Sequence, residues 1–133
     1  MDVPAGFTPF DDQGPFLEHV GPIHIRDDGG ALVLGLRAED RHANHRGTVQ
    51  GGLLSTFADF ALGRAIGADA DDGKGRATVS LTVDFLKPAT PGDWIQSSTR
   101  VDRVGGTLAF ADCSLTVEGD EIVRARAVFV AVD

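Results

Sequence analysis

The stretch 44–59 constrains the fold of this chain more than any other. It reads as a polar loop, a Gly51-Gly52 pair and then an apolar helix that carries one carboxylate, Asp59. Between residues 53 and 66 the apolar side chains recur at the three- and four-residue spacing of a helix. A carboxylate among apolar side chains costs free energy unless its neighbours compensate for it. Asp59 is therefore either satisfied by a partner or used for chemistry.

The chain before this stretch predicts little regular structure. Residues 1–12 are rich in Pro, Gly and Asp, and we expect them to be loosely ordered. A short helix is predicted over 15–20, with proline in its first turn. A hairpin follows over 23–37, with its turn at Asp27-Asp-Gly-Gly30.

The chain after the central helix is β in character. An acidic, glycine-rich segment over 67–75 predicts an exposed loop. Four strands joined by tight turns then follow, over 77–86, 93–104, 107–117 and 122–132. In the first of these strands, Val79, Leu81, Val83 and Phe85 alternate onto one side. An antiparallel sheet that wraps one buried helix accounts for this order of elements, which predicts a single α+β domain over 1–133.

Composition excludes several classes of function. The net charge of −8 disfavours nucleic acid, whose binding proteins present a basic face. No apolar run is long enough for a transmembrane helix, and the N-terminus lacks the pattern of a secretory signal. Cys113 has no partner for an intrachain disulfide and lies in a strand-like stretch, so we interpret it as core packing. We expect a cytoplasmic protein.

Several motifs occur together in this sequence. They are Asn44, Gly47, Gln50-Gly51-Gly52 and Asp59, then 79–89 (Val-Ser-Leu-Thr-Val-Asp-Phe-Leu-Lys-Pro-Ala), Gly92, Arg103-Val-Gly-Gly106 and 125–129. Together they resemble the hotdog-fold acyl-CoA thioesterases, in particular the phenylacetyl-CoA thioesterase-like branch. The resemblance runs from about residue 15 to the C-terminus.

The resemblance implies a five- or six-stranded antiparallel sheet around a central helix. It also implies a homodimer in which two sheets form one continuous sheet, active sites at the dimer interface, and assembly into homotetramers. Coenzyme A would enter as part of the substrate, with no separate cofactor. One residue departs from the family pattern, because Gln50 stands where the family usually has a histidine. A glutamine amide still donates a hydrogen bond but does not titrate near neutrality.

Thioester hydrolysis requires an attacking oxygen, a proton acceptor and donors aimed at the developing oxyanion. The Gly51 amide suits the last role, because first-turn amides lack helical partners and glycine permits close approach. The alternative is that Gly51-Gly52 only permits a sharp loop-to-helix junction. Asp59 suits the role of general base or nucleophile. Its alternative is a structural acid, held by a loop or paired with Arg64.

Other candidates depend more heavily on the resemblance. Asn44 either donates to the carbonyl or positions its loop. Thr78 stands where relatives carry a water-positioning Ser or Thr, contributed from the partner subunit, although it also reads as an ordinary strand residue. His42 and His45 lack the other ligands of a metal site. We interpret them as solvated loop residues, with His45 near the entrance to the site.

The phosphates of coenzyme A require cations at the entrance. Arg46, Lys87, Arg103 and the amides of Gly105-Gly106 are the candidates, with solvated surface charge as the alternative for each. We therefore predict an acyl-CoA thioesterase for a medium-sized or aromatic acyl group. The competing predictions are a non-catalytic acyl-CoA binding module, which the glutamine favours, and a hotdog enoyl-CoA hydratase or dehydratase, which the glutamine weakens.

Overall fold

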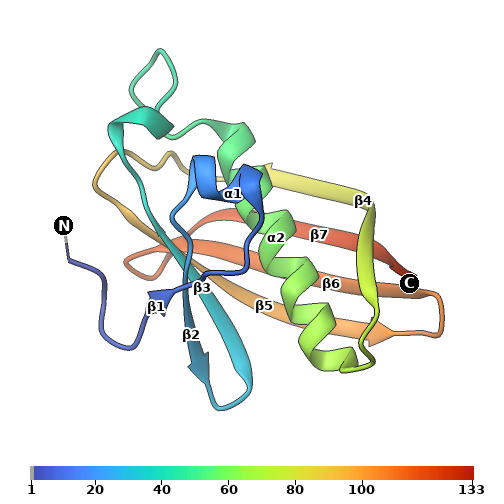
Figure 1. Cartoon of the computed structure of the whole chain (residues 1–133). Coiled ribbons are helices and arrows are strands. Elements are labelled where there is room, and N and C mark those ends of the chain that lie inside the picture. Colours follow the sequence, from blue (N-terminus) through green and yellow to red (C-terminus); the bar gives the residue numbers. More distant parts are fainter. Residues whose placement is uncertain (1) are drawn as a thin grey trace.

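The computed structural model describes residues 2–133, and Met1 lies outside them. One long helix lies against a curved sheet, with a short helix beside it (Figure 1). The elements in chain order are β1 (Thr8–Pro9), α1 (Pro15–Val20), β2 (His24–Asp28), β3 (Ala31–Arg37), the 3-10 turn η1 (Asp40–His42), α2 (Gly51–Ala70), β4 (Gly75–Phe85), β5 (Trp94–Val104), β6 (Leu108–Val117) and β7 (Asp120–Val132).

The strands form one antiparallel sheet in the order β1-β2-β3-β5-β6-β7-β4. This confirms the predicted antiparallel sheet around one helix, including the hairpin and the four C-terminal strands. The sheet has seven strands rather than five or six, and one of them, β1, has only two residues. The helix α2 contacts β3, β4, β5, β6 and β7 and so spans most of the sheet.

Burial explains why α2 stays on the sheet. Its fully buried side chains follow helical spacing and face the strands; they are Leu54, Phe57, Ala58, Ala61, Leu62 and Ile66. The helix continues to Ala70, four residues into the predicted loop, and is followed by Asp71 in the left-handed conformation (φ 45°). Among residues 2–133, no helix combines the length and hydropathy needed to cross a membrane.

A truncation in this interface measures how much α2 depends on the sheet. Leu62 is fully buried, so Leu62→Ala is expected to lower the free energy of unfolding by about 2–5 kcal/mol through lost burial and a residual cavity. Urea unfolding at fixed protein concentration checks this value. The control is Leu108→Ala, because Leu108 is 40% exposed and its truncation is expected to cost about 0.5 kcal/mol or less. Equal costs at both positions would contradict this packing.

The expectation of a loose N-terminal segment is wrong for the residues around β1. Phe7 and Phe10 are buried, and β1 pairs with β2. Phe7 packs edge-on against Trp94 at 5.0 Å between ring centroids, and Phe10 lies 5.6 Å from Phe60 of α2. Two aromatic side chains supply enough apolar contact to order a segment whose composition otherwise indicates a loop.

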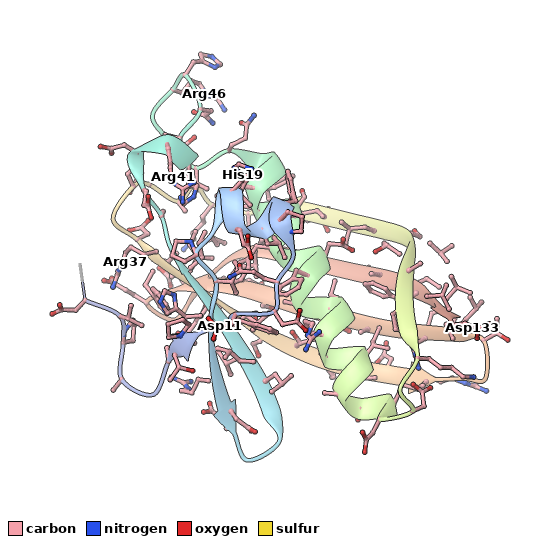
Figure 2. All side chains as sticks on the ribbon, in the orientation of Figure 1. Asp11, His19, Arg37, Arg41, Arg46 and Asp133 are labelled. Carbon is pink, nitrogen blue, oxygen red and sulfur yellow. The ribbon has the colours of Figure 1, made fainter. Side chains whose placement is uncertain are left out.

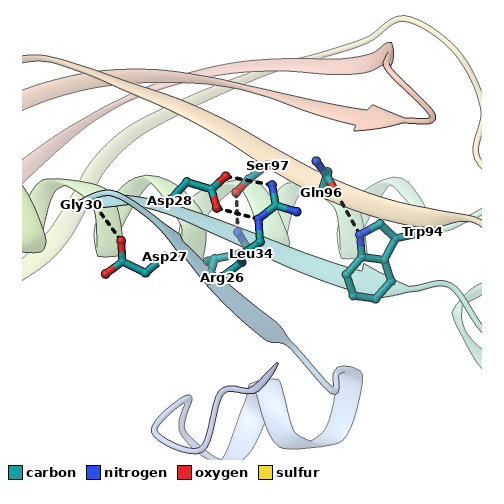
Figure 3. A network of polar contacts seen from close by, with 8 residues as sticks. All are labelled: Arg26, Asp27, Asp28, Gly30, Leu34, Trp94, Gln96 and Ser97. Carbon is teal, nitrogen blue, oxygen red and sulfur yellow. Dashed lines mark hydrogen bonds and ion pairs between the residues drawn. The ribbon is translucent and has the colours of Figure 1, made fainter. Parts of the chain in front are cut away.

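At the junction of β3 and β5, Leu34 lies beside Ser97, with Trp94 nearby on β5 (Figure 3). A Cβ at Gly35 would lie 2.0 Å from the Trp94 ring, so only glycine admits the indole there. The Ser97 hydroxyl, which is almost fully buried, accepts a hydrogen bond from the Leu34 amide at 3.0 Å. These contacts hold β2 and β3 against the rest of the sheet.

The strand β4 forms one edge of the sheet and pairs only with β7. Its ladder shifts between Thr78 and Ser80, which leaves Val79 as the extra residue of a bulge. The predicted alternation holds from Leu81 through Val83 to Phe85, and the bulge interrupts it at Val79. Val79 is 59% exposed and Phe85 is 54% exposed, whereas Leu81 and Val83 are partly buried. An eleven-residue edge with exposed apolar side chains is a ready surface for further pairing.

Candidate active site

Asp59 lies half-buried on α2 beside the start of β4. Its Oδ1 atom accepts a hydrogen bond from the Thr78 hydroxyl at 2.7 Å. Both residues line a cavity of about 600 Å³ between the C-terminal half of α2 and β4. The structure thus brings Thr78 to Asp59 within one chain, rather than from a partner subunit as the resemblance implies. We call Asp59 and Thr78 the acid half-site.

The alternative of an Asp59–Arg64 ion pair is contradicted. None of the ion pairs between residues 2 and 133 includes either side chain. The Arg64 guanidinium instead lies over the Phe10 ring, 4.9 Å from its centroid. Asp59 is therefore a carboxylate with one hydroxyl partner, open to a cavity, and available to act on a bound molecule.

The start of α2 is fixed by the loop before it and by β4. The Gln50 amide donates to the His42 carbonyl at 2.9 Å, and the Val49 amide donates to the Ala89 carbonyl at 2.8 Å. The Gln50 carbonyl then accepts from the first bonded amides of the helix, those of Leu53 and Leu54. The amides of Gly51 and Gly52 find no acceptor within the described chain, as the first turn of a helix requires. They remain free to bind an oxyanion.

Asn44 positions this loop. Its Oδ1 atom accepts from the amides of Arg46 at 2.9 Å and Thr48 at 3.2 Å, while its Nδ2 donates to the Thr48 hydroxyl at 2.9 Å. These bonds form an Asx-type turn that closes the loop. The structure thus supports the second of the two roles expected for Asn44, although one Nδ2 hydrogen stays uncommitted.

A second cavity, of about 370 Å³, lies against the start of α2. It is lined by Asn44, Arg46, Thr48, Val49, Gly51, Leu54 and residues 85–89. A Cβ at Gly51 would lie 3.3 Å from the Phe85 ring, so this ring covers the glycine from the β4 side. Gln50, whose side chain makes no capping bond, lines a neighbouring cavity of about 300 Å³ with Asn44 and Gly52. We call Asn44, Gln50, Gly51 and Gly52 the donor half-site.

The two half-sites do not meet within one chain. Gly51 and Asp59 are eight residues apart on α2, which places them ~12 Å apart along the helix axis. A single thioester carbonyl cannot contact both, because reacting atoms must approach within about 3–3.5 Å. The structure therefore places the predicted acid and the predicted oxyanion donor in two separate environments of a single copy.

The predicted rim cations separate in the same way. Arg46 lies on the loop before α2 (Figure 2), and Lys87, which follows β4, lines the same cavity of about 370 Å³. Arg103 and Gly105-Gly106 lie at the β5–β6 turn, at the opposite end of the fold (Figure 1). Phe85 pairs with Val123 and Leu108 pairs with Val130, a separation of ~23 Å along β7.

Some of these groups are already engaged. The Gly105 amide donates to the Leu108 carbonyl at 2.8 Å, so the expectation of a free phosphate-binding amide is wrong for Gly105. Lys87 makes a loose ion pair with Asp120 at 3.7 Å, and its side chain is largely exposed. Arg46 and Arg103 make no ion pair with any residue in 2–133, which leaves both available to an anion.

The two loop histidines do not form a metal site. His42 is buried, its Nδ1 accepts from the Glu39 amide at 2.9 Å, and its Nε2 lies 2.5 Å from the Val20 carbonyl oxygen. The expectation of a solvated His42 is therefore wrong, because this ring holds α1 to the loop through both nitrogens. His45 is exposed, as expected. Within the described residues no three His, Cys, Asp or Glu side chains form a group that could hold a metal ion.

Cys113 is confirmed as a core residue. Burial, with a smaller contribution from the neighbouring Asp112, raises the pKa of its thiol to about 12. The thiolate that a nucleophile needs is therefore strongly disfavoured at neutral pH.

Comparison with known proteins shows the family to which this chain belongs. A family model for the thioesterase superfamily matches residues 46–124, more than half of the chain, including Gly51, Asp59 and Thr78. The chain belongs to the thioesterase superfamily. A candidate esterase of Pseudomonas aeruginosa is 41% identical over 97% of this chain and 97% of its own length. Mouse acyl-coenzyme A thioesterase 13 is 31% identical over 64% of this chain and 60% of its own length.

Solved structures support the same fold. The Escherichia coli PaaI protein from the phenylacetic acid degradation operon superimposes with a TM-score of 0.80 at 21% identity, over 90% of this chain and 86% of that chain. This thioesterase has the hotdog fold predicted from its motifs, and it is a thioester hydrolase. The prediction of an enzyme is thus confirmed over the prediction of a binding module.

Sequence reasoning missed two residues near the site. Phe85 was predicted only to share one side of its strand with Val79, Leu81 and Val83, and its ring lies over Gly51. Arg64 was considered only as a partner of Asp59, but it lines the same cavity with its guanidinium unpaired within the described chain. The spacing gave no signal for the second, because positions five apart on a helix lie about 140° apart around its axis; only the shared cavity brings Arg64 near Asp59.

Proposed function

We propose that this thioesterase hydrolyses coenzyme A thioesters of medium-sized or aromatic acyl groups at a site shared by two copies of the chain. The observation that carries this proposal is the environment of the Asp59 side chain. Its carboxylate is half-buried, hydrogen-bonded by one hydroxyl and open to a cavity of about 600 Å³. The similarity to an acyl-coenzyme A thioesterase supports coenzyme A as the thiol part of the substrate.

Two copies are needed because each one separates its acid and donor half-sites by ~12 Å. Within a chain, Asp59 contacts Thr78 at one end of β4, and Gly51 lies against Phe85 at the other end. An antiparallel pairing of β4 with β4 of a second copy sets Thr78 of one chain near Phe85 of the other. The same two-fold operation brings Asp59 of each copy to Gly51 of the other, forming two equivalent sites.

This pairing also explains the exposed edge. It would cover the free side of β4 and the exposed Val79 and Phe85, which a lone copy leaves in water. It also brings Arg46 and Lys87 of one copy toward Arg103 of the other, giving a cationic entrance for the phosphates of coenzyme A. We extend the proposal to pairs of such dimers forming homotetramers, which sedimentation of the 14.0 kDa chain would test.

In the proposed reaction Asp59 takes a proton from water as the water oxygen attacks the thioester carbon. The carbonyl oxygen becomes an oxyanion bound by the Gly51 amide of the other copy, at the positive end of α2. The side-chain carboxamide of Gln50 adds a donor, and Asn44 holds the loop that presents it. Collapse of the intermediate breaks the carbon–sulfur bond, and the proton held by Asp59 passes to the departing thiolate.

A covalent variant uses the same residues. Asp59 would attack the carbonyl carbon itself and form a mixed anhydride, which water then cleaves. Because Gln50 does not titrate, neither variant draws a proton from the position where relatives carry histidine. Asp59 is thus the residue on which both variants depend.

A panel of acyl-CoAs tests this proposal through release of free thiol. Acetyl-, hexanoyl-, benzoyl- and phenylacetyl-CoA sample length and aromaticity. We expect the highest kcat/KM with hexanoyl- or phenylacetyl-CoA, and a peak for acetyl-CoA would contradict a medium-sized or aromatic substrate. If no member of the panel is hydrolysed faster by wild type than by Asp59→Asn, the proposed chemistry is wrong.

Thr78 is a positioning residue in this scheme, because it acts through Asp59. Thr78→Val removes one hydrogen bond to a charged acceptor and is expected to lower kcat about 10-fold or more with little change in KM. Thr78→Ser keeps the hydroxyl and should recover most of kcat. A serine variant as slow as the valine variant would show that the hydroxyl does not orient Asp59.

A further inference from the structure

Arg64 is an exposed cation at the edge of the cavity that holds Asp59. It lies five residues after Asp59 on α2, and both line the cavity of about 600 Å³. Its guanidinium lies over the Phe10 ring at 4.9 Å from the centroid, and it makes no ion pair or side-chain hydrogen bond with residues 2–133. Stacking on an aromatic face restrains a guanidinium while leaving its N–H groups free.

The other charges at this cavity leave Arg64 available. Arg76 is committed to Asp72 through a bond of 2.9 Å, and this contact holds the Asp72 pKa at about 2. Lys74 lines the cavity without an ion pair in the described chain, and Asp71 lines it at the helix end. Besides Asp59, the cavity thus offers more free cationic than anionic groups.

We infer that the acyl group of the preferred substrate ends in a carboxylate, which Arg64 binds at the far side of the cavity from the thioester. This inference rests on the proposed function and specifies its substrate class. Arginine pairs with carboxylates through two parallel N–H donors, so an unpaired guanidinium in a partly apolar cavity fits that group closely. Leu32, Phe60 and Phe129 line the cavity and supply apolar surface for the carbons between the two carboxyl groups.

Position favours the acyl group over the phosphates of coenzyme A as the source of this anion. Arg64 lies ~7.5 Å from Asp59 along the helix axis and about 140° from it around that axis, and both line one cavity, so a group that Arg64 binds lies across this cavity from the reacting carbon. The pantetheine arm separates the thioester sulfur from the nearest phosphate by many more bonds than a short diacid places between its two carboxyl groups. A four- or five-carbon diacid spans the shorter distance. The distal carboxylate of such a diacid would lie beside Arg64, and this attraction offsets the repulsion between that carboxylate and Asp59.

Two matched pairs of thioesters test the inference: succinyl- with butanoyl-CoA, and glutaryl- with pentanoyl-CoA. Each pair differs only in the distal carboxylate. Wild type is expected to hydrolyse the diacid thioester of at least one pair with the higher kcat/KM. Arg64→Met is expected to lower kcat/KM for that diacid thioester about 10- to 100-fold, while the value for its neutral partner is kept or raised. Arg64→Lys keeps the charge but loses the planar donors, and should fall between.

The control variant is Arg126→Met, because Arg126 lies exposed on the outer face of β7. In each pair of thioesters, this variant should leave unchanged the ratio of kcat/KM for the diacid thioester to kcat/KM for its neutral partner. An Arg64→Met variant with wild-type ratios would overturn the inference. So would an equal loss for all four substrates that disappears with the phosphate-free N-acetylcysteamine thioesters, since Arg64 would then bind a phosphate of coenzyme A.

Failure of the inference is distinguishable from failure of the proposed function. Suppose that neutral acyl-CoAs are hydrolysed in an Asp59-dependent manner but the preference for diacid over neutral thioesters is the same in wild type and in Arg64→Met. Then only the inference about the distal carboxylate is wrong. If no coenzyme A thioester is hydrolysed in an Asp59-dependent manner, the proposed function is wrong as well.

Discussion

Asp59→Asn is expected to lower kcat about 10²- to 10⁴-fold while leaving the fold intact. The amide has the shape of the carboxylate and still accepts a hydrogen bond from Thr78, but it neither removes a proton from water nor attacks a thioester. Release of thiol from hexanoyl- or phenylacetyl-CoA measures the loss. Substrate binding should persist, because Asp59 contributes to the transition state more than to the ground state.

The matched control for this substitution is Asp69→Asn, in the last turn of the same helix. Asp69 is exposed and does not line the cavity that holds Asp59. It should retain wild-type kcat, and both variants should unfold at wild-type urea concentrations. An Asp59→Asn enzyme with wild-type turnover would show that the carboxylate is a structural acid.

Gly51→Pro is the second substitution with a large expected effect, because it removes the proposed oxyanion donor. Proline lacks the amide hydrogen but is well tolerated at the first position of a helix, which Gly51 occupies. The preceding residue, Gln50, has φ −58° and ψ 130°, a conformation compatible with a following proline. We expect kcat to fall about 10²- to 10³-fold.

Gly51→Ala distinguishes two roles of this glycine, namely its amide hydrogen as a donor and the space left by its missing side chain. It adds a Cβ, 3.3 Å from the Phe85 ring, but it keeps the amide. Because this contact requires a shift of only a few tenths of an ångström and the amide is kept, the alanine variant should lose far less activity than the proline variant. Equal losses would mean that the glycine supplies space rather than a donor.

Local patterns were enough to predict the elements. Helical spacing over 53–66 and alternation in the C-terminal strands gave the helix, the sheet and their order, because burial of one face decides both patterns. Predictions failed where a contact with a distant segment decides the outcome. Phe7 and Phe10 are ordered by Trp94 and Phe60, which no local composition reveals. The bulge at Val79 depends on the pairing with β7.

The candidate site follows the same division. The free amide of Gly51 and the acid of Asp59 were predictable, because each follows from its position on one helix. Their separation was also predictable, because eight residues of helix span ~12 Å. The two residues were instead assigned to one site because they belong to one motif. The roles of Asn44 and His42 depended on hydrogen bonds to Thr48, Glu39 and Val20, which spacing alone does not reveal.

The central claim is that each catalytic site takes Asp59 from one copy and the Gly51 amide from another. Mixing inactive Asp59→Asn chains with inactive Gly51→Pro chains tests it most directly, after unfolding and refolding them together. Random pairing makes half of the dimers mixed, and each mixed dimer has one of its two sites intact, so activity should recover to about a quarter of wild type. If the mixture stays as inactive as the separate variants, the site lies within a single chain and the account is wrong.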